Sequence, residues 1–429
     1  MSTLSTSAAS ASPTTQPTRQ GTFSSLRHRN YRLFFIGQLV SVCGTWMQSI
    51  ALATYLLYRL DGGGRELGIL SACNFTPVLV FGLWAGAIVD RGNKRRILIA
   101  AQALMGVAAV ALTAMVIFDV VTFPLLCAIA AVTGVGNAFD MPARQSFISE
   151  MVPPESLQNA VALSSAIFNG GRVVGQAVAG VLVSVFGYAW CFGINAASFG
   201  AIIIGLIAMH TAELRPVVPM ARAKGQVADG LRHVRQTPVL RTVLLLVLVI
   251  GIFSLNFQVF VPLVAKNVFH GREGKVALFQ VFLASGSLVG ALLAARRSGP
   301  SGRLIVRSAI IFALSMSGLA VSNVEPVTWA LLFIMGGAFM TLLNTVNATL
   351  QLSSDPALRG RVMSVYTLVL VGSTPVGAPL AGWVADRFGA RTSIAIGAVA
   401  AAIVCGGAIL ALGRGLLNAG RVEPSPQRR

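Results

Sequence analysis

Hydrophobic runs of about 20 residues, the length an α-helix needs to cross a bilayer core, recur through nearly the whole chain between short polar stretches. Strands of a membrane barrel would instead alternate apolar and polar side chains, and these runs do not alternate. The pattern therefore predicts an all-α membrane protein with twelve transmembrane helices. The predicted helices cover residues 33–58, 66–89, 97–118, 121–146, 159–185, 189–210, 241–263, 276–295, 304–323, 326–351, 361–384 and 392–413.

Composition supports this interpretation, because only 11% of the 429 residues are charged and 55% are hydrophobic, whereas about a quarter are charged in typical soluble domains. The net charge of +19 is unevenly distributed. If the N-terminus is cytoplasmic, the cytoplasmic loops and tails carry 25 of the 33 Lys and Arg residues. This bias follows the positive-inside rule. It predicts a multi-pass protein of the cytoplasmic (inner) membrane with both termini in the cytoplasm, whose partner is the lipid bilayer and not nucleic acid.

The two halves of the chain match at an offset of 202 residues. Residues 175–187 read GQAVAGVLVSVFG, and residues 377–389 read GAPLAGWVADRFG. A six-helix unit repeated in the same orientation predicts a pseudo-two-fold axis along the membrane normal. Any substrate site is then expected near the midplane, between the halves.

The repeat and the polar stretches predict the domain organisation. We expect a disordered cytoplasmic tail at 1–29 and a six-helix half at 30–210. A cytoplasmic linker at 211–240 would join it to a second six-helix half at 241–413, and a cytoplasmic tail would follow at 414–429.

Residues 86–96 read GAIVDRGNKRR, so that an acid, Asp90, and a basic run follow the second predicted helix. Twelve helices in two like halves with this motif resemble the major facilitator superfamily. Residues 140–165, DMPARQSFISEMVPPESLQNAVALSS, are similar to its transmembrane secretion effector branch, which includes the enterobactin exporter and bacterial drug exporters. The resemblance covers residues 30–413. One departure is that Asn93 stands where the family has a glycine, and we expect Asn to adopt the left-handed backbone of that turn.

The resemblance implies a gating role for this stretch. Asp90 would face the N-terminus of the eleventh helix, where the helix dipole favours an anion by about 0.3–1 kcal/mol. Arg95 would reach Asp140, which we expect about one to two turns from the cytoplasmic end of the fourth helix. This relay would lock the cytoplasmic side in the outward-facing state; alternatively the basic residues, above all Lys94 and Arg96, only set the topology. The candidate gating residues are Gly86, Asp90, Arg91, Arg95, Asp140, Arg144 and Arg361.

Arg172 lies about halfway along the predicted fifth helix, where an ionisable group is costly unless it is paired or hydrated. Either it binds substrate or couples transport in the central cavity, or it has a purely structural partner. Neutral polar residues at helical spacing likewise either hold helices together or line a cavity, and we favour the cavity for the first and seventh helices. These candidates are Gln38, Ser41, Thr45, Asn74, Asn256, Gln258, Asn344 and Asn347.

Glycines recur on the fifth and eleventh helices, at Gly171, Gly175, Gly180, Gly377 and Gly382. Small residues let membrane helices approach closely. The close contact is either static packing or a smooth interface that slides during transport.

The chain contains no nucleotide-binding loop, no H-E-x-x-H zinc motif and no paired catalytic carboxylates in a soluble segment. We therefore expect no enzyme activity, no cofactor and no metal site. The favoured function is a monomeric secondary transporter that exports small molecules such as drugs or siderophores by alternating access. The alternatives are an uptake permease for a metabolite and, more remotely, a signalling or scaffold protein.

Proton-coupled antiport is implied by the resemblance alone, because the antiporter motifs are incomplete. Ala130 stands where the family has an arginine on the fourth helix, and Gln176 stands where it has a proline on the fifth. The residue that would carry the proton stays open. Asp140 is the only carboxylate well inside an apolar run.

The charge bias predicts that reporter fusions at Gly21 and Gly420 behave as cytoplasmic. An alkaline phosphatase fusion, which matures only outside the cytoplasm, should be inactive at both sites, and a fluorescent protein fusion should be bright at both. An active phosphatase at either site would overturn the predicted topology.

Overall fold

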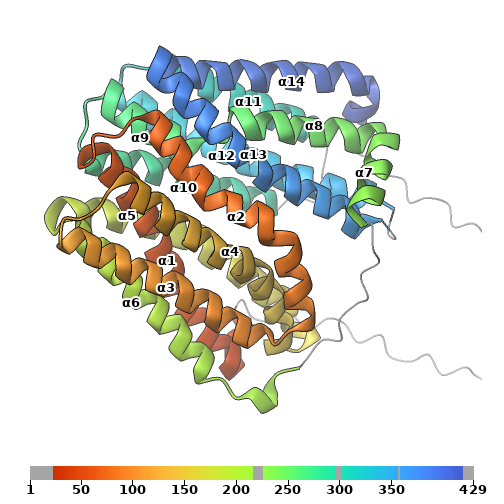
Figure 1. Ribbon diagram of the computed structural model, residues 1–429. Coiled ribbons are helices and arrows are strands. Elements are labelled where there is room, and N and C mark those ends of the chain that lie inside the picture. The colour runs from red at the N-terminus through yellow and green to blue at the C-terminus, as the bar shows by residue number, and fades with distance from the viewer. Residues whose placement is uncertain (1–22, 216–225, 296–301, 356–357, 419–429) are drawn as a thin grey trace, which may run out of the picture.

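A computed structural model describes residues 23–215, 226–295, 302–355 and 358–418, and within these ranges the regular structure is entirely helical. The first bundle contains α1 (Arg29–Tyr58), α2 (Gly64–Arg91), α3 (Lys94–Ile117), α4 (Phe123–Met151), α5 (Pro154–Val185) and α6 (Tyr188–Ile207). The second contains α8 (Pro238–Phe253), α9 (Phe257–Leu263), a π-helical turn (Val264–Val268), α10 (Glu273–Ala295), α11 (Gly302–Val321), α12 (Glu325–Ser353), α13 (Arg359–Phe388) and α14 (Ala390–Asn418). Figure 1 shows the two bundles side by side.

Eleven helices of the described chain are long and apolar enough to span a membrane, with α8, α9 and the π-helical turn forming one of them. The twelfth span is α2, whose segments Gly64–Gly82 and Trp84–Arg91 meet at 56°. With α2 taken as one bent span, the twelve predicted spans are confirmed.

The predicted ends on both sides of the loop between the fourth and fifth helices were wrong by five residues, because α4 continues to Met151 and α5 already begins at Pro154. Residues 147–150, FISE, continue the α4 helix although half of them are polar. Hydropathy marks the part of a helix that lipid or protein buries, and a helix can run on past it. Pro153, with an extended backbone, separates the two helices.

Parts of the predicted tails and linker lie outside the described residues: 1–22, 216–225 and 419–429. At the end of the predicted N-terminal tail, a 3-10 helix (Ser24–Arg27) is attached to α5, because the Ser25 hydroxyl donates to the Ser156 carbonyl at 2.9 Å. In the predicted linker, α7 (Gln226–Gln236) packs against α13 and α8.

Helix packing follows the predicted repeat. In the first bundle α1 packs on α5 and α6, α2 on α4, and α3 on α4 and α6. In the second bundle α8 packs on α13 and α14, α10 on α12, and α11 on α12 and α14. Between the bundles α2 packs on α13, and the equivalent pair is α10 on α5. The same pairings in both halves are those that a pseudo-two-fold axis requires.

Matched glycines occupy matched positions of close packing. A Cβ on Gly175 would overlap the Cys43 carbonyl oxygen of α1, and a Cβ on Gly377 would overlap the Ile252 carbonyl oxygen of α8. Gly171 also faces α1. The two remaining candidate glycines face the other bundle, Gly180 towards α10 and Gly382 towards α2.

Gly175→Ala should lower the thermal unfolding temperature of the purified protein in detergent. The added methyl group meets backbone, which cannot move aside as a side chain can, and such overpacking costs about 1–3 kcal/mol. Gly170→Ala is the matched control, because a Cβ at Gly170 on the same helix meets nothing within 4 Å. The control should be neutral or stabilising, since Ala is the better helix former by about 1 kcal/mol. Equal effects of the two substitutions would contradict the close contact.

Candidate gates and substrate pathway

Asp386 on α13 caps the N-terminus of α2 in the other bundle. Its Oδ1 accepts from the Gly64 amide at 2.6 Å and its Oδ2 accepts from the Arg65 amide at 2.8 Å. A carboxylate is stabilised there because the first amides of a helix lack intrahelical partners and carry a partial positive charge. The sequence analysis missed Asp386. A signal was present, since 382–387 read GWVADR and share the G-x-x-x-D-R spacing of residues 86–91.

Other polar contacts join the bundles at the same end of the molecule, the Asp386 end. The Lys266 ammonium donates to the Leu57 carbonyl at 2.5 Å and lies 5.4 Å from the centre of the Tyr58 ring. The Tyr58 hydroxyl donates to the Gly271 carbonyl at 2.6 Å. These contacts tie the end of α1 to the segment between the π-helical turn and α10.

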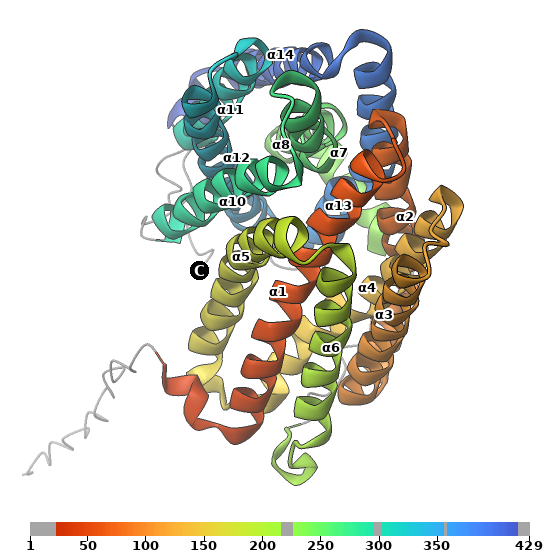
Figure 2. The same ribbon diagram turned by 90° about the vertical axis from the view of Figure 1, so that its left-hand side faces the viewer.

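An apolar cluster also crosses between the bundles at the Asp386 end. It joins Leu56 and Leu67 of the first bundle to Val259 and Leu263 of the second, and each of the four is buried. In Figure 1 the bundles converge at the left and diverge towards the opposite end, where α2 ends and α13 begins. Asp90 is in the last turn of α2, so we call this the Asp90 end. Figure 2 looks onto the joined ends. The structure is therefore closed at the Asp386 end.

The GAIVDRGNKRR stretch forms the end of α2 and the start of α3 at the Asp90 end. Gly86 and Asp90 are half-buried and Arg91 is exposed. Asn93 adopts an extended backbone, with φ of −75°, so the predicted left-handed conformation is wrong. Instead its side chain caps α3, because Asn93 Oδ1 accepts from the Arg96 amide at 3.0 Å. Arg361, also half-buried, lies in the first turn of α13.

The expected contact between Arg95 and Asp140 does not form in this conformation. Arg95 donates to the carbonyls of Leu206 at 2.6 Å and Ile207 at 2.9 Å, which end α6. Asp140 lies eleven residues before Met151 at the end of α4, or about 16 Å along the helix, and is therefore deeper than predicted. The carbonyl groups at the end of α6 carry a partial negative charge, which attracts the Arg95 guanidinium.

Asp140 is fully buried within the first bundle. It forms an ion pair with Arg144 one turn later, and it accepts from the Gln102 amide of α3 at 2.7 Å. Ser41 of α1 completes the network through a 3.4 Å hydrogen bond to Gln102. Ser41 thus links α1 to α3 instead of lining a cavity.

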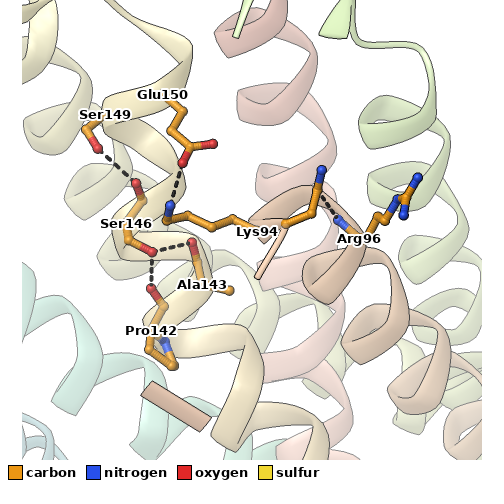
Figure 3. A network of polar contacts seen from close by, with 8 residues as sticks. Lys94, Arg96, Pro142, Ala143, Ser146, Ser149 and Glu150 are labelled. Carbon is orange, nitrogen blue, oxygen red and sulfur yellow. Dashed lines mark hydrogen bonds and ion pairs between the residues drawn. The ribbon is translucent and has the colours of Figure 1, made fainter. Parts of the chain in front are cut away.

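Lys94 and Glu150 form a second buried ion pair, shown in Figure 3. Lys94 Nζ and Glu150 Oε1 are 2.5 Å apart, and both side chains are about one-tenth exposed. The pair fastens the start of α3 to the last turn of α4. The interpretation of Lys94 as a topology signal alone is therefore wrong, and only the Arg96 side chain of the two is exposed.

The predicted candidate Gln258 meets a polar residue of α1 across the bundles. Ser49 donates to Gln258 Oε1 of α9 at 3.1 Å, so the polar faces of the first and seventh spans meet. Thr45, half-buried, donates to the Ser41 carbonyl of its own helix. Gln38 is buried inside the first bundle.

The remaining polar candidates divide into two groups. Asn74 donates to the Ala130 carbonyl at 3.3 Å and thereby joins α2 to α4, while Asn256 is buried at the break between α8 and α9. On α12, Asn344 is exposed and Asn347 is half-buried. Asn74 and Asn256 therefore contribute to packing inside the bundles, whereas Asn344 and Asn347 lie on an accessible face of α12.

Arg172 lies near the middle of α5 with its guanidinium 5.0 Å from the centre of the Trp46 ring of α1. Within the described part of the chain, no cluster of three or more His, Cys, Asp or Glu side chains is arranged to hold a metal ion.

Comparisons with known proteins agree with this architecture. The profile of a protein family described as transmembrane secretion effector matches residues 20–417. Macrolide efflux protein A of Streptococcus pyogenes is 25% identical over 374 residues, which cover 85% of this chain and 92% of that protein. Multidrug efflux pump Tap of Mycobacterium tuberculosis is 27% identical over 389 residues, covering 88% and 91%.

Solved transporter structures share the fold. A bacterial homologue of the human lysosomal transporter Spinster, in an inward-facing and unoccupied conformation, has a TM-score of 0.73 at 14% identity, with 92% of this chain and 99% of that chain covered. A D-xylose-proton symporter has a TM-score of 0.70 at 14% identity, with 89% and 96% covered.

Asp386→Asn should shift the protein towards opening at the Asp386 end, because it removes the anion that holds α2. Labelling of a cysteine introduced at Ser49 in a cysteine-free background should become faster from that side, by about two- to fivefold for a loss of up to 1 kcal/mol. Glu66→Gln is the control, since Glu66 also lies at the α2 N-terminus but accepts from Gly63 of its own helix. Equal labelling in Asp386→Asn and wild type would show that the contact does not hold this end closed.

Proposed function

The chain belongs to the transmembrane secretion effector family of the major facilitator superfamily, and from that premise we propose that it is a secondary active exporter of small molecules. Family membership is the observation that carries this proposal. It is supported by relatives that are named as macrolide and multidrug efflux pumps. If the Asp90 end is cytoplasmic, as the charge bias predicts, the present conformation opens towards the cytoplasm. That is the state in which an exporter loads its substrate.

We propose that alternating access uses two carboxylates on the antiparallel pair α2 and α13. Asp386 holds the α2 N-terminus when the Asp386 end is closed. Asp90 would hold the α13 N-terminus, near Arg361, when the opposite end is closed. Gly86 would permit the close approach of the helices, and Arg91 and Arg95 would supply the neighbouring positive charge.

We place proton coupling at Asp140, because its carboxylate is fully buried and paired with Arg144. Protonation of Asp140 would remove one charge of the pair and leave Arg144 without its counterion. A buried charge without a partner is costly, so the network with Gln102 and Ser41 would rearrange. That rearrangement would link proton movement to the packing of α1, α3 and α4.

Cells of a pump-deficient host that express the wild-type protein should accumulate less of at least one radiolabelled compound than control cells, in a panel that contains a macrolide and amphipathic carboxylates. A protonophore should abolish the difference. Asp140→Asn should raise accumulation to the level of control cells, because it removes the proton acceptor at nearly constant shape. Glu155→Gln, which neutralises an exposed carboxylate on α5, should behave as wild type.

Higher accumulation in wild-type cells than in control cells would identify an uptake permease instead. If wild-type and control cells accumulated equal amounts of the macrolide, and of each drug in a wider panel, multidrug export would be excluded.

A further inference from the structure

We propose that Arg172, Gln176 and Trp46 form the substrate-binding site, and that this site selects amphipathic organic anions. This inference rests on the proposed transport function and names its substrate class. Arg172 and Gln176 lie on α5 and Trp46 lies on α1. Helix α5 packs against both α1 and α10, and Figure 2 shows the three helices close to one another.

A polar stripe runs along one face of α5. Ser165, Asn169, Arg172 and Gln176 follow one another at spacings of four, three and four residues, which places them on the same side of a helix. Gly180 continues the stripe towards the Asp386 end, where a Cβ would lie 2.7 Å from Ala277 of α10. The stripe therefore lies on the side of α5 that turns towards the second bundle.

Exposure along this stripe falls from Ser165 to Gln176. Ser165 is exposed, Asn169 and Arg172 are half-buried, and Gln176 is 2% exposed. The second bundle thus covers the stripe at the Asp386 end and leaves it accessible towards the Asp90 end. Arg172 and Gln176 stand at the closed end of this accessible face, as expected for the inner end of a substrate pathway that opens on one side.

Two buried polar atoms at this closed end lack hydrogen-bond partners among the described residues. They are Arg172 Nε, a donor, and Gln176 Oε1, an acceptor. Buried polar groups are nearly always satisfied, so an orphaned donor beside an orphaned acceptor indicates a missing ligand. Among the described residues the guanidinium has no carboxylate partner, and it lies over the face of the Trp46 ring, 5.0 Å from the ring centre.

The chemistry of these side chains defines the ligand. A guanidinium presents a planar set of donors that matches a carboxylate or a similar oxyanion. The Trp46 ring, with Phe168 at 5.8 Å in an edge-to-face arrangement, offers an aromatic surface beside it. Phe168 is 46% exposed, so an incoming apolar group can reach that surface. The Gln176 amide can accept from a hydroxyl or amide of the ligand.

The test compares three probes of nearly equal size that differ in charge: naphthalene-1-acetate, naphthalene-1-acetamide and 1-naphthylmethylammonium. Binding to the full-length protein in detergent is measured by isothermal titration calorimetry. Wild type should bind the acetate at least about tenfold more tightly than the acetamide, as expected for a charge-assisted hydrogen bond. The ammonium should bind most weakly.

Variants separate the site from general effects of charge and folding. Arg172→Gln should reduce the preference for the acetate to within about twofold, whereas Arg172→Lys should retain part of it. Arg232→Gln, which removes an exposed arginine of α7, should leave the preference unchanged. Trp46→Leu should weaken the binding of all three probes and leave the order of their affinities unchanged. Each variant is checked for an unaltered unfolding temperature.

No binding of the acetate at millimolar concentration, or an undiminished preference in a folded Arg172→Gln variant, would overturn this inference. Macrolide efflux without an anion preference would refute the site and leave the exporter. An anion preference that depends on Arg172, in a protein that moves no substrate, would support the site and refute the exporter.

Discussion

The contact between Asp386 and the amides of Gly64 and Arg65 is the constraint on which the observed conformation depends. It joins residues more than 300 positions apart, and it places a charge of one bundle against a helix dipole of the other. Polar contacts from Lys266 and Tyr58 join the bundles at the same end. This contact holds the bundles together where α2 begins and α13 ends, and the bundles diverge at the other end of the same two helices.

The two pseudo-symmetric seams between the bundles are not chemically equal. The position on α5 that corresponds to Asp386 is Ser184, whose hydroxyl donates to Gly180 of its own helix at 2.6 Å. The seam of α2 and α13 is therefore fastened by charge, and the seam of α5 and α10 by packing. Inside the first bundle the Lys94–Glu150 ion pair and the hydrogen bond from Gln102 to Asp140 tie α3 to α4. Bundles that are held together at one end by polar contacts and an apolar cluster are suited to rocking.

The spans, the repeat and the family could be predicted because hydropathy and periodicity depend on residues that are near one another in sequence. The Arg95–Asp140 contact does not form in this conformation, and the position of Asp140 within α4 could not be predicted, because the mixed polar and apolar residues 144–150 concealed the end of α4. Lys94 illustrates the same limit. Its partner Glu150 lies 56 residues away, and no local pattern links them. The orphaned atoms of Arg172 and Gln176 were equally hidden, since only three-dimensional packing shows which polar groups lack partners.

The glycine contacts restrict how this protein can diverge. The charges of Lys94 and Glu150 can be exchanged through paired substitutions, because this contact is made by two side chains and a second mutation can compensate for the first. At Gly175 and Gly377 the obstacle is a carbonyl oxygen of the main chain, and no codon change in the neighbouring helix can remove it. Covariation analysis of related sequences should therefore detect the ion pair and no partner for Gly175 or Gly377, because a position that does not vary carries no signal about its partner.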